Sequence, residues 1–133
     1  MPGSGYSLCR VDEITRDPQL LKGILPTLIL AALGHQESYG YELVTRLRDA
    51  GLTDIAPGTV YPVLTRLERD GSLEAHLVAS PSGPARKYYR PTAAGHTRLA
   101  DGTTAWNALA HVVRTMTSAP APTSTPTTDG DDR

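Results

Sequence analysis

The fold of this chain is governed by Pro-Gly-Thr-Val-Tyr-Pro-Val-Leu-Thr-Arg-Leu-Glu-Arg-Asp-Gly, residues 57–71. Its apolar residues recur at i, i+3, i+4 and i+7, which is the period of a helix with one buried face. They are Val60, Val63, Leu64 and Leu67. The opposite face consists of Thr59, Pro62, Thr65, Arg66 and Arg69, a surface with several hydrogen-bond donors and no carboxylate. Gly71 is a typical helix stop. The stretch predicts an amphipathic helix with a donor-rich outer surface.

The start of this helix depends on Pro62. Proline has no N–H, so it is well tolerated only in the first turn, where the amides have no intrahelical partner. A helix that begins at Pro57 would place Pro62 in the interior, at a cost of roughly 3 kcal/mol. We therefore expect Thr59 to be the N-cap.

Two helices precede it. Asp17 and Pro18 are a cap and a first helical residue, and we expect the first helix to run to about Leu33 and to end at Gly34. That helix is apolar nearly all round, which suggests burial on both sides and a partner subunit. We expect Ser38 to cap a second helix, from Tyr39 to about Ala50.

A hairpin and a long helix follow. Residues 72–79 and 86–90 are expected to form two strands joined by Ser-Pro-Ser-Gly-Pro, with Leu73, Ala75, Leu77 and Ala79 on one face. Thr92 is the expected cap of a last helix that ends near Met116. Its apolar residues Leu99, Trp106 and Val113 recur every seven positions, with Leu109 and Met116 beside them, which indicates an association stripe. Gly95 and Gly102 weaken this helix by about 1 kcal/mol each relative to alanine.

The pattern predicts an α+β fold that is mainly α: a winged helix-turn-helix domain with a C-terminal dimerisation helix. We expect a flexible arm at 1–16, the DNA-binding domain at 17–91, the dimerisation helix at 92–117 and a disordered tail at 118–133. The single cysteine, Cys9, allows no intrachain disulfide and fits a reducing cytoplasm. The apolar run 20–33 is too short to span a bilayer.

Enzymatic chemistry has little support in the sequence. The four histidines show no metal-ligand spacing with Cys9 or with carboxylates, and no catalytic triad or phosphate-binding glycine loop stands at a recognisable spacing. We expect no catalytic residues, no metal and no cofactor. The net charge of −1 is indecisive, but cations gather late in the domain. They are Arg66, Arg69, Arg86, Lys87 and Arg90.

Four motifs in this order resemble the PadR family of bacterial transcription regulators. They are Leu-Lys-Gly (21–23), Tyr-Gly-Tyr-Glu-Leu (39–43), the stretch 57–71 and Arg-Lys-Tyr-Tyr-Arg-Pro-Thr-Ala-Ala-Gly (86–95). The resemblance covers roughly residues 20 to 116. It implies a winged helix-turn-helix, a dimerisation helix and repression of nearby genes. The chain is similar to the subfamily with a short C-terminus, because one helix follows the wing.

The resemblance implies which residues contact DNA. The third helix would enter the major groove, the hairpin would touch the backbone or the minor groove, and the start of the second helix would contact phosphate. The residues are Ser38, Tyr39, Thr59, Tyr61, Pro62, Thr65, Arg66, Arg69, Arg86, Lys87 and Tyr88. Alternatives remain at three positions. Arg69 could pair with an acidic neighbour, Tyr61 could pack in the core, and one of Tyr88 and Tyr89 is expected to be buried.

Trp106 is the only tryptophan in a chain that has no phenylalanine. By resemblance to the multidrug-sensing branch of the family, it would stack a planar drug at the dimer interface. Thr103, Leu109, Ala110, Val113, Thr27 and Leu30 would line that site. The alternative is that Trp106 only anchors the dimer.

The functional expectation is a homodimeric repressor in the cytoplasm that binds an inverted-repeat operator in double-stranded DNA. Half-sites would lie one helical turn apart, roughly 34–36 Å. A small aromatic effector would release the DNA. The rival expectation is a winged-helix dimer that serves as a protein-interaction or ligand-sequestering module, without specific DNA binding.

Overall fold

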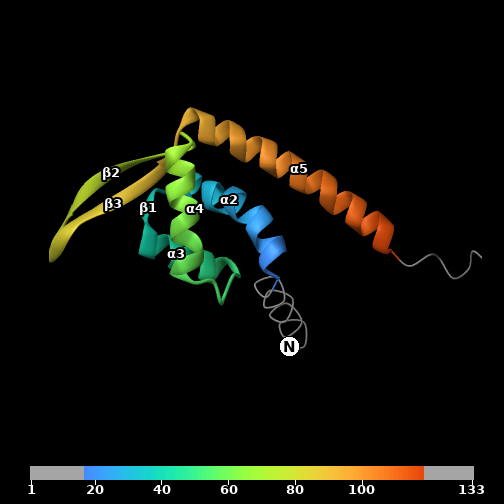
Figure 1. The fold of residues 1–133 in the computed structure, drawn as a ribbon, viewed down its shortest axis with the longest axis horizontal. Coiled ribbons are helices and arrows are strands. Elements are labelled where there is room, and N and C mark those ends of the chain that lie inside the picture. Colours follow the sequence, from blue (N-terminus) through green and yellow to red (C-terminus); the bar gives the residue numbers. More distant parts are fainter. Residues whose placement is uncertain (1–16, 119–133) are drawn as a thin grey trace, which may run out of the picture. The chain divides into compact units, whose positions relative to one another are not determined.

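A computed structural model describes residues 17–118 of the chain (Figure 1). By its internal contacts the chain divides into two compact units, Met1–Thr103 and Thr104–Arg133. The described part is mainly helical with one small antiparallel sheet, which confirms the predicted fold class. The elements are α2 (Pro18–His35), β1 (Ser38–Tyr39), α3 (Gly40–Ala50), α4 (Pro57–Arg69), β2 (Leu73–Ser80), β3 (Gly83–Pro91) and α5 (Ala93–Thr117).

The hydrophobic core of the first unit lies between α2, α3 and α4. The apolar stripe of α4 is buried as the sequence predicts, and Leu64 and Leu67 have no exposed surface. Leu25 and Ile29 of α2 are also fully buried, and so is Leu43 of α3. Because only one side of α4 enters this core, its other side is left facing solvent.

The expected ends of α2 and α3 are partly right. Asp17 caps α2, since its Oδ1 accepts a hydrogen bond from the Leu20 amide at 3.1 Å. The helix continues through Gly34 to His35, past the expected end. The prediction that Ser38 caps α3 is wrong. Ser38 lies in β1, and the N-cap position belongs to Tyr39, which makes no side-chain capping bond.

The expected start of α4 is also wrong. The helix begins at Pro57 with Ala56 as its N-cap residue, and Pro62 lies inside it. Pro57 suits the first helical position because its fixed φ is already helical. Pro62 cannot donate to the Gly58 carbonyl, but Gly58 is exposed, so water can bond that oxygen. The loss at Pro62 is therefore smaller than in a buried helix interior.

The sheet has three strands in the order β1-β3-β2, all antiparallel. The sequence analysis did not predict β1, which pairs Ser38 with Tyr89 and so ties the hairpin to the helices. Figure 1 shows β2 and β3 extending away from the helices. For that reason the expected apolar face of β2 is buried only at its base: Leu73 is 2% exposed, whereas Leu77 is 71% exposed.

The first turns of α5 pack against the end of α4. The Thr92 side chain caps the helix as predicted, accepting from the Gly95 amide at 3.1 Å and donating to the Gly71 carbonyl at 2.6 Å. A Cβ on Gly95 would lie 2.0 Å from the Ser72 carbonyl oxygen. A Cβ on Gly102 would lie 2.5 Å from the Thr27 hydroxyl. Both glycines have a low helix propensity. Because they lack a Cβ, however, α5 can approach Ser72 and Thr27 more closely than any other residue at these positions would allow.

The first compact unit extends to Thr103, inside α5, because Gly95 and Leu99 belong to its packing. The expected division into a DNA-binding domain and a dimerisation helix at residue 91 stays a prediction. The expected arm at 1–16, with Cys9, lies outside the described residues. The expected disordered tail also lies outside them, except for Ser118.

We predict that Gly95→Ala destabilises the protein by roughly 1–3 kcal/mol, because the new methyl group would overlap a backbone carbonyl. Gly23→Ala in α2 is the matched control, since a Cβ there meets no atom within 4 Å. Helix propensity predicts a neutral or stabilising effect at that site, up to about 1 kcal/mol. Urea unfolding of both variants checks this, and equal stability for the two would contradict the close packing.

Candidate nucleic-acid interface

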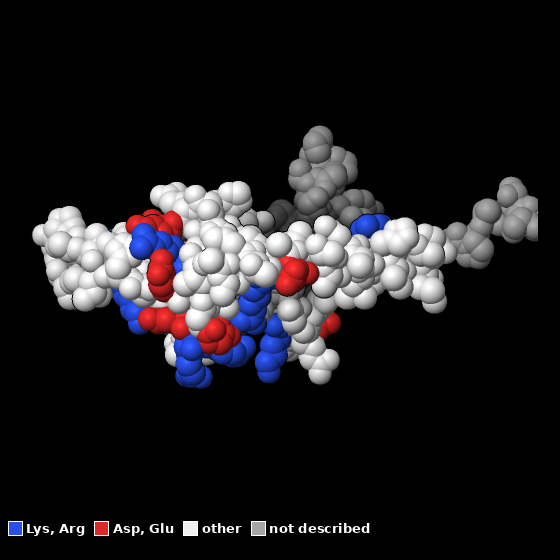
Figure 2. Space-filling model, turned by 90° about the horizontal axis from the view of Figure 1, so that it is seen from above, with Lys and Arg blue, Asp and Glu red and all other residues white. Residues whose placement is uncertain are grey.

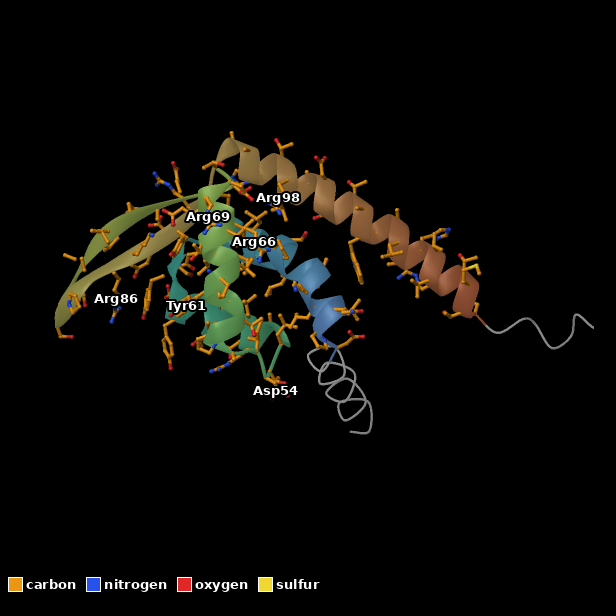
Figure 3. All side chains as sticks on the ribbon, in the orientation of Figure 1. Asp54, Tyr61, Arg66, Arg69, Arg86 and Arg98 are labelled. Atoms are coloured by element: carbon orange, nitrogen blue, oxygen red, sulfur yellow. The ribbon has the colours of Figure 1, made fainter. Side chains whose placement is uncertain are left out.

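The exposed face of α4 carries the residues that the sequence analysis assigned to it. Its apolar stripe fixes the rotation of the helix, so that donors and small polar groups point to solvent. Figure 3 shows Tyr61, Arg66 and Arg69 along this helix, with Arg86 on the neighbouring hairpin. All of the predicted α4 residues are exposed: Thr59, Tyr61, Pro62, Thr65, Arg66 and Arg69.

The two arginines of this face are unpaired. Among residues 17–118, neither Arg66 nor Arg69 forms a salt bridge or a side-chain hydrogen bond. The acidic neighbour that could have held Arg69 is Asp70, but Asp70 pairs with Arg98 at 2.8 Å. Slight burial raises the pKa of Asp70, yet hydrogen bonds from Ser72 and Arg98 outweigh it and lower that pKa below its usual value. Both guanidinium groups therefore remain available to an anionic partner.

Tyr61 lies at the edge of the α4 face and packs on α3. A Cβ on Gly40 would lie 2.1 Å from the Tyr61 ring, so the ring rests directly over the first residue of α3. The side chain is still 43% exposed. Tyr61 thus packs on α3 and still has exposed surface. Packing against the protein and contact with DNA, the two alternatives for this residue, are therefore compatible.

The hairpin cations are held by neighbouring side chains. Lys87 Nζ lies 3.0 Å from Glu68 Oε1 of α4, and this hydrogen bond raises the pKa of Lys87. The Arg86 guanidinium lies over the Tyr39 ring, 4.5 Å from its centroid. Tyr39 in turn packs against Tyr88, with ring centroids 5.4 Å apart. These contacts fix the position of the hairpin beside α4.

Tyr88 and Tyr89 alternate sides of β3 as expected. Tyr89 packs against the core and Tyr88 contacts Tyr39. Ser38 does not fit its expected role in phosphate contact. It is 1% exposed and its hydroxyl accepts a hydrogen bond from Arg46 at 2.6 Å. Arg46 also donates to the carbonyls of Ala32 and Gln36, so it closes the end of α2.

Sequence reasoning missed three residues of this region. Arg46 holds β1 in place, Glu68 restrains Lys87, and Gly40 admits the Tyr61 ring. Only Gly40 left a signal, as the glycine between two tyrosines in the 39–43 motif. The contacts of Arg46 and Glu68 join residues from different elements, which no local pattern reveals.

Charge on the surface is mixed. Figure 2 shows Lys and Arg side chains gathered along one side of the molecule, with Asp and Glu among them. Several cations of the first compact unit are neutralised locally, because Lys87, Arg90 and Arg98 pair with Glu68, Glu74 and Asp70. The unpaired cations of α4 therefore account for more of the available positive charge than the sequence count suggests.

The residues expected to line a ligand site fall in both compact units. In the first unit, Leu30 is fully buried in the core and has no exposed surface to offer a ligand, which speaks against its assignment. Thr27 lies against Gly102, and Thr103 is exposed. In the second unit, large apolar side chains of α5 are exposed, with Trp106 at 42%. The others are Leu109, Val112, Val113 and Met116.

A helix-turn-helix made of α3 and α4, followed by a β-hairpin, defines a winged-helix DNA-binding protein. Residues 29–101 match the model of the PadR-like transcriptional regulator family, and the chain belongs to that family. It is 39% identical to a transcriptional regulator of Mycobacterium tuberculosis over 87 residues, which are 64% of this chain and 78% of the relative.

Solved structures of transcription regulators are similar to this chain in fold and sequence. A PadR-like regulator of Bacillus cereus aligns with a TM-score of 0.70 and 36% identity, over 77% of this chain and 99% of that one. A Streptococcus transcriptional regulator aligns with a TM-score of 0.68 and 40% identity, over 74% and 96%. The chain is thus a DNA-binding transcription regulator and not an enzyme. Within residues 17–118, no helix is long and apolar enough to cross a membrane.

We predict that Glu68→Gln strengthens binding to DNA of any sequence, because it frees Lys87 for phosphate. Loss of an exposed ion pair should change the stability by no more than about 1 kcal/mol. The pKa of Lys87 should fall toward its ordinary value. Side-chain NMR titration and binding to scrambled duplex check both effects. The matched control is Glu74→Gln, which frees Arg90 of the hairpin in the same way. Comparing the DNA affinity of the two variants shows whether the gain is specific to the side of the hairpin next to α4.

Proposed function

We propose that this protein is a homodimeric repressor that inserts α4 into the major groove of an inverted-repeat operator. The observation that carries the proposal is the exposed face of α4, where Arg66 and Arg69 have no protein partner among the described residues. Thr59 and Thr65 add hydroxyl groups on the same face. Arginine can hydrogen-bond to guanine edges with two donors, whereas hydroxyl groups contact bases or phosphates.

The hairpin would act as a wing on the DNA backbone. Arg86 is exposed and its guanidinium is oriented by Tyr39, while Lys87 can exchange Glu68 for a phosphate oxygen. Contacts of this kind position a protein on the duplex without reading its sequence. Because the target is DNA, we place the protein in the cytoplasm.

Dimerisation is supported by the distal part of α5. Leu109, Val113 and Met116 of α5 are each about half exposed or more, and none of them belongs to the buried core of residues 17–118. A helix with such an apolar side needs a partner. A second copy of the same helix is the partner that also brings a second α4, so that the dimer can bind the two half-sites of an inverted repeat, roughly 34–36 Å apart.

We further propose that an apolar aromatic effector stacks on Trp106 and changes the affinity for DNA. The support is an exposed indole on a helix with small neighbours, Thr103 and Ala110. An effector acts only if it binds the DNA-free and DNA-bound forms with different affinity. The alternative remains that Trp106 is a packing anchor of the dimer.

The rival function is a winged-helix dimer that binds proteins or sequesters ligands rather than a specific DNA site. The pairing of Lys87, Arg90 and Arg98 with carboxylates supports it, because few free cations remain for phosphates. The two functions make opposite predictions for variants of the exposed cations.

We predict that Arg66→Ala combined with Arg86→Ala abolishes discrimination between operator and scrambled DNA. Fluorescence anisotropy on labelled DNA from upstream of the protein's own gene, at fixed salt, measures the loss. The matched control is Arg90→Ala with Arg114→Ala, which removes the same charge from a hairpin cation paired with Glu74 and from the distal part of α5. A repressor keeps most of its discrimination in the control. If neither pair alters binding, the interaction module is favoured.

Effector binding has its own test. We predict that a planar apolar compound such as 2-naphthol quenches Trp106 fluorescence and lowers operator affinity over the same concentration range. Trp106→Leu should remain a dimer by ultracentrifugation but lose the response of DNA affinity to this compound. Absence of quenching would assign Trp106 to packing alone, and quenching without any change in DNA affinity would contradict a role of the ligand in regulation.

A further inference from the structure

A hollow of about 340 Å³ lies between the start of α2 and the exposed face of α4. Its floor is apolar and includes Leu21, Leu25 and Val63. Three hydrogen-bond donors from the two helices line it: Lys22, Thr59 and Arg66. No carboxylate lines it, so the hollow is a place where positive charge is concentrated next to the α4 face.

Lys22 is the new element in this arrangement. The sequence analysis gave it no role beyond the Leu-Lys-Gly motif, and it comes from a different helix than the residues expected to contact DNA. It is exposed and has no ion-pair or hydrogen-bond partner within residues 17–118. Lys87, Arg90 and Arg98, by contrast, are held by carboxylates. Lys22 and Arg66 thus form a pair of uncompensated cations around one hollow.

We propose that Lys22, Thr59 and Arg66 together hold one phosphate of the DNA backbone beside the groove that α4 enters. The inference rests on the proposed function. An ammonium, a hydroxyl and a guanidinium are the side-chain donors that phosphate oxygens accept from in protein–DNA complexes. A helix in the major groove has sugar–phosphate strands on both sides, so a cationic hollow beside its exposed face is placed to meet one of them.

Arg66 and Lys22 then have different roles in DNA binding. Arg66 lies on the helix that enters the groove, so its guanidinium has donors for a base edge as well as for the phosphate, whereas Lys22 lies on α2, outside the groove. A phosphate held by Lys22 from one side and Thr59 from the other fixes how far α4 can slide along its own axis. Lys22 therefore sets the register of the reading helix without contributing to sequence preference.

The test measures operator affinity as a function of salt for wild type and Lys22→Gln. Removal of one phosphate contact should reduce the slope of log K against log[salt] by roughly one. The loss of affinity should be the same on operator and on scrambled duplex, so that their ratio is unchanged. Lys22→Arg, which keeps the charge, should restore the wild-type slope. Thermal unfolding of each variant checks that the fold is intact.

Arg114→Gln is the matched control, because it removes the same charge from an exposed residue of the second compact unit. Its slope should equal that of wild type. An unchanged slope in Lys22→Gln, or an equal decrease in Lys22→Gln and Arg114→Gln, overturns the phosphate site while leaving the repressor function standing. Failure of the wild-type protein to prefer its operator overturns the proposed function itself, and the inference with it.

Discussion

The burial of one side of α4 is the constraint on which the rest of this structure depends. Val60, Val63, Leu64 and Leu67 enter the core formed with α2 and α3, and each large side chain contributes about 1.5–3 kcal/mol relative to its exposed state. Rotating the helix to bury its other side would place Arg66 and Arg69 in that core without partners, which is far more costly. The same apolar stripe therefore stabilises the domain and directs the donor-rich face outward.

Other contacts keep that face in place at its two ends. At the start of α4, the Tyr61 ring rests on Gly40, so the angle between α3 and α4 depends on the absence of a side chain there. At the end of α4, Gly71 has a φ of 86° and turns the chain into β2. Gly95 of α5 packs directly against the backbone carbonyl of Ser72. Arg46 adds a third support, because it binds the end of α2 and Ser38 of β1 together.

The sequence predicted the elements of the fold better than their contacts. The helix positions and the hairpin followed from period and turn residues, because those signals are local. Pro62 misled the placement of the α4 start, since the cost of a proline inside a helix was taken in full, although the Gly58 carbonyl that loses its partner belongs to an exposed residue. Strand β1 left no signal, because two residues show no periodicity and its pairing comes from β3.

The candidate DNA interface was also predicted only in part from the sequence. The α4 residues follow from position on a helix, and their exposure agrees with that pattern. Ser38 and Leu30 were assigned by resemblance, and their burial speaks against the expected contacts, because each is surrounded by its own protein. Glu68, which holds Lys87, could not be found from sequence, since the two residues lie on different elements and only the folded chain brings them within 3.0 Å.

The proposed repressor function requires that the exposed face of α4 reads DNA. The sharpest measurement follows the Arg Nε–Hε NMR signals of the protein during titration with duplex from upstream of its gene and with scrambled duplex. If α4 reads DNA, the Arg66 and Arg69 signals move to new positions only with the upstream duplex, while Arg114 is unchanged. Perturbations confined to α5, or identical for both duplexes, would contradict it.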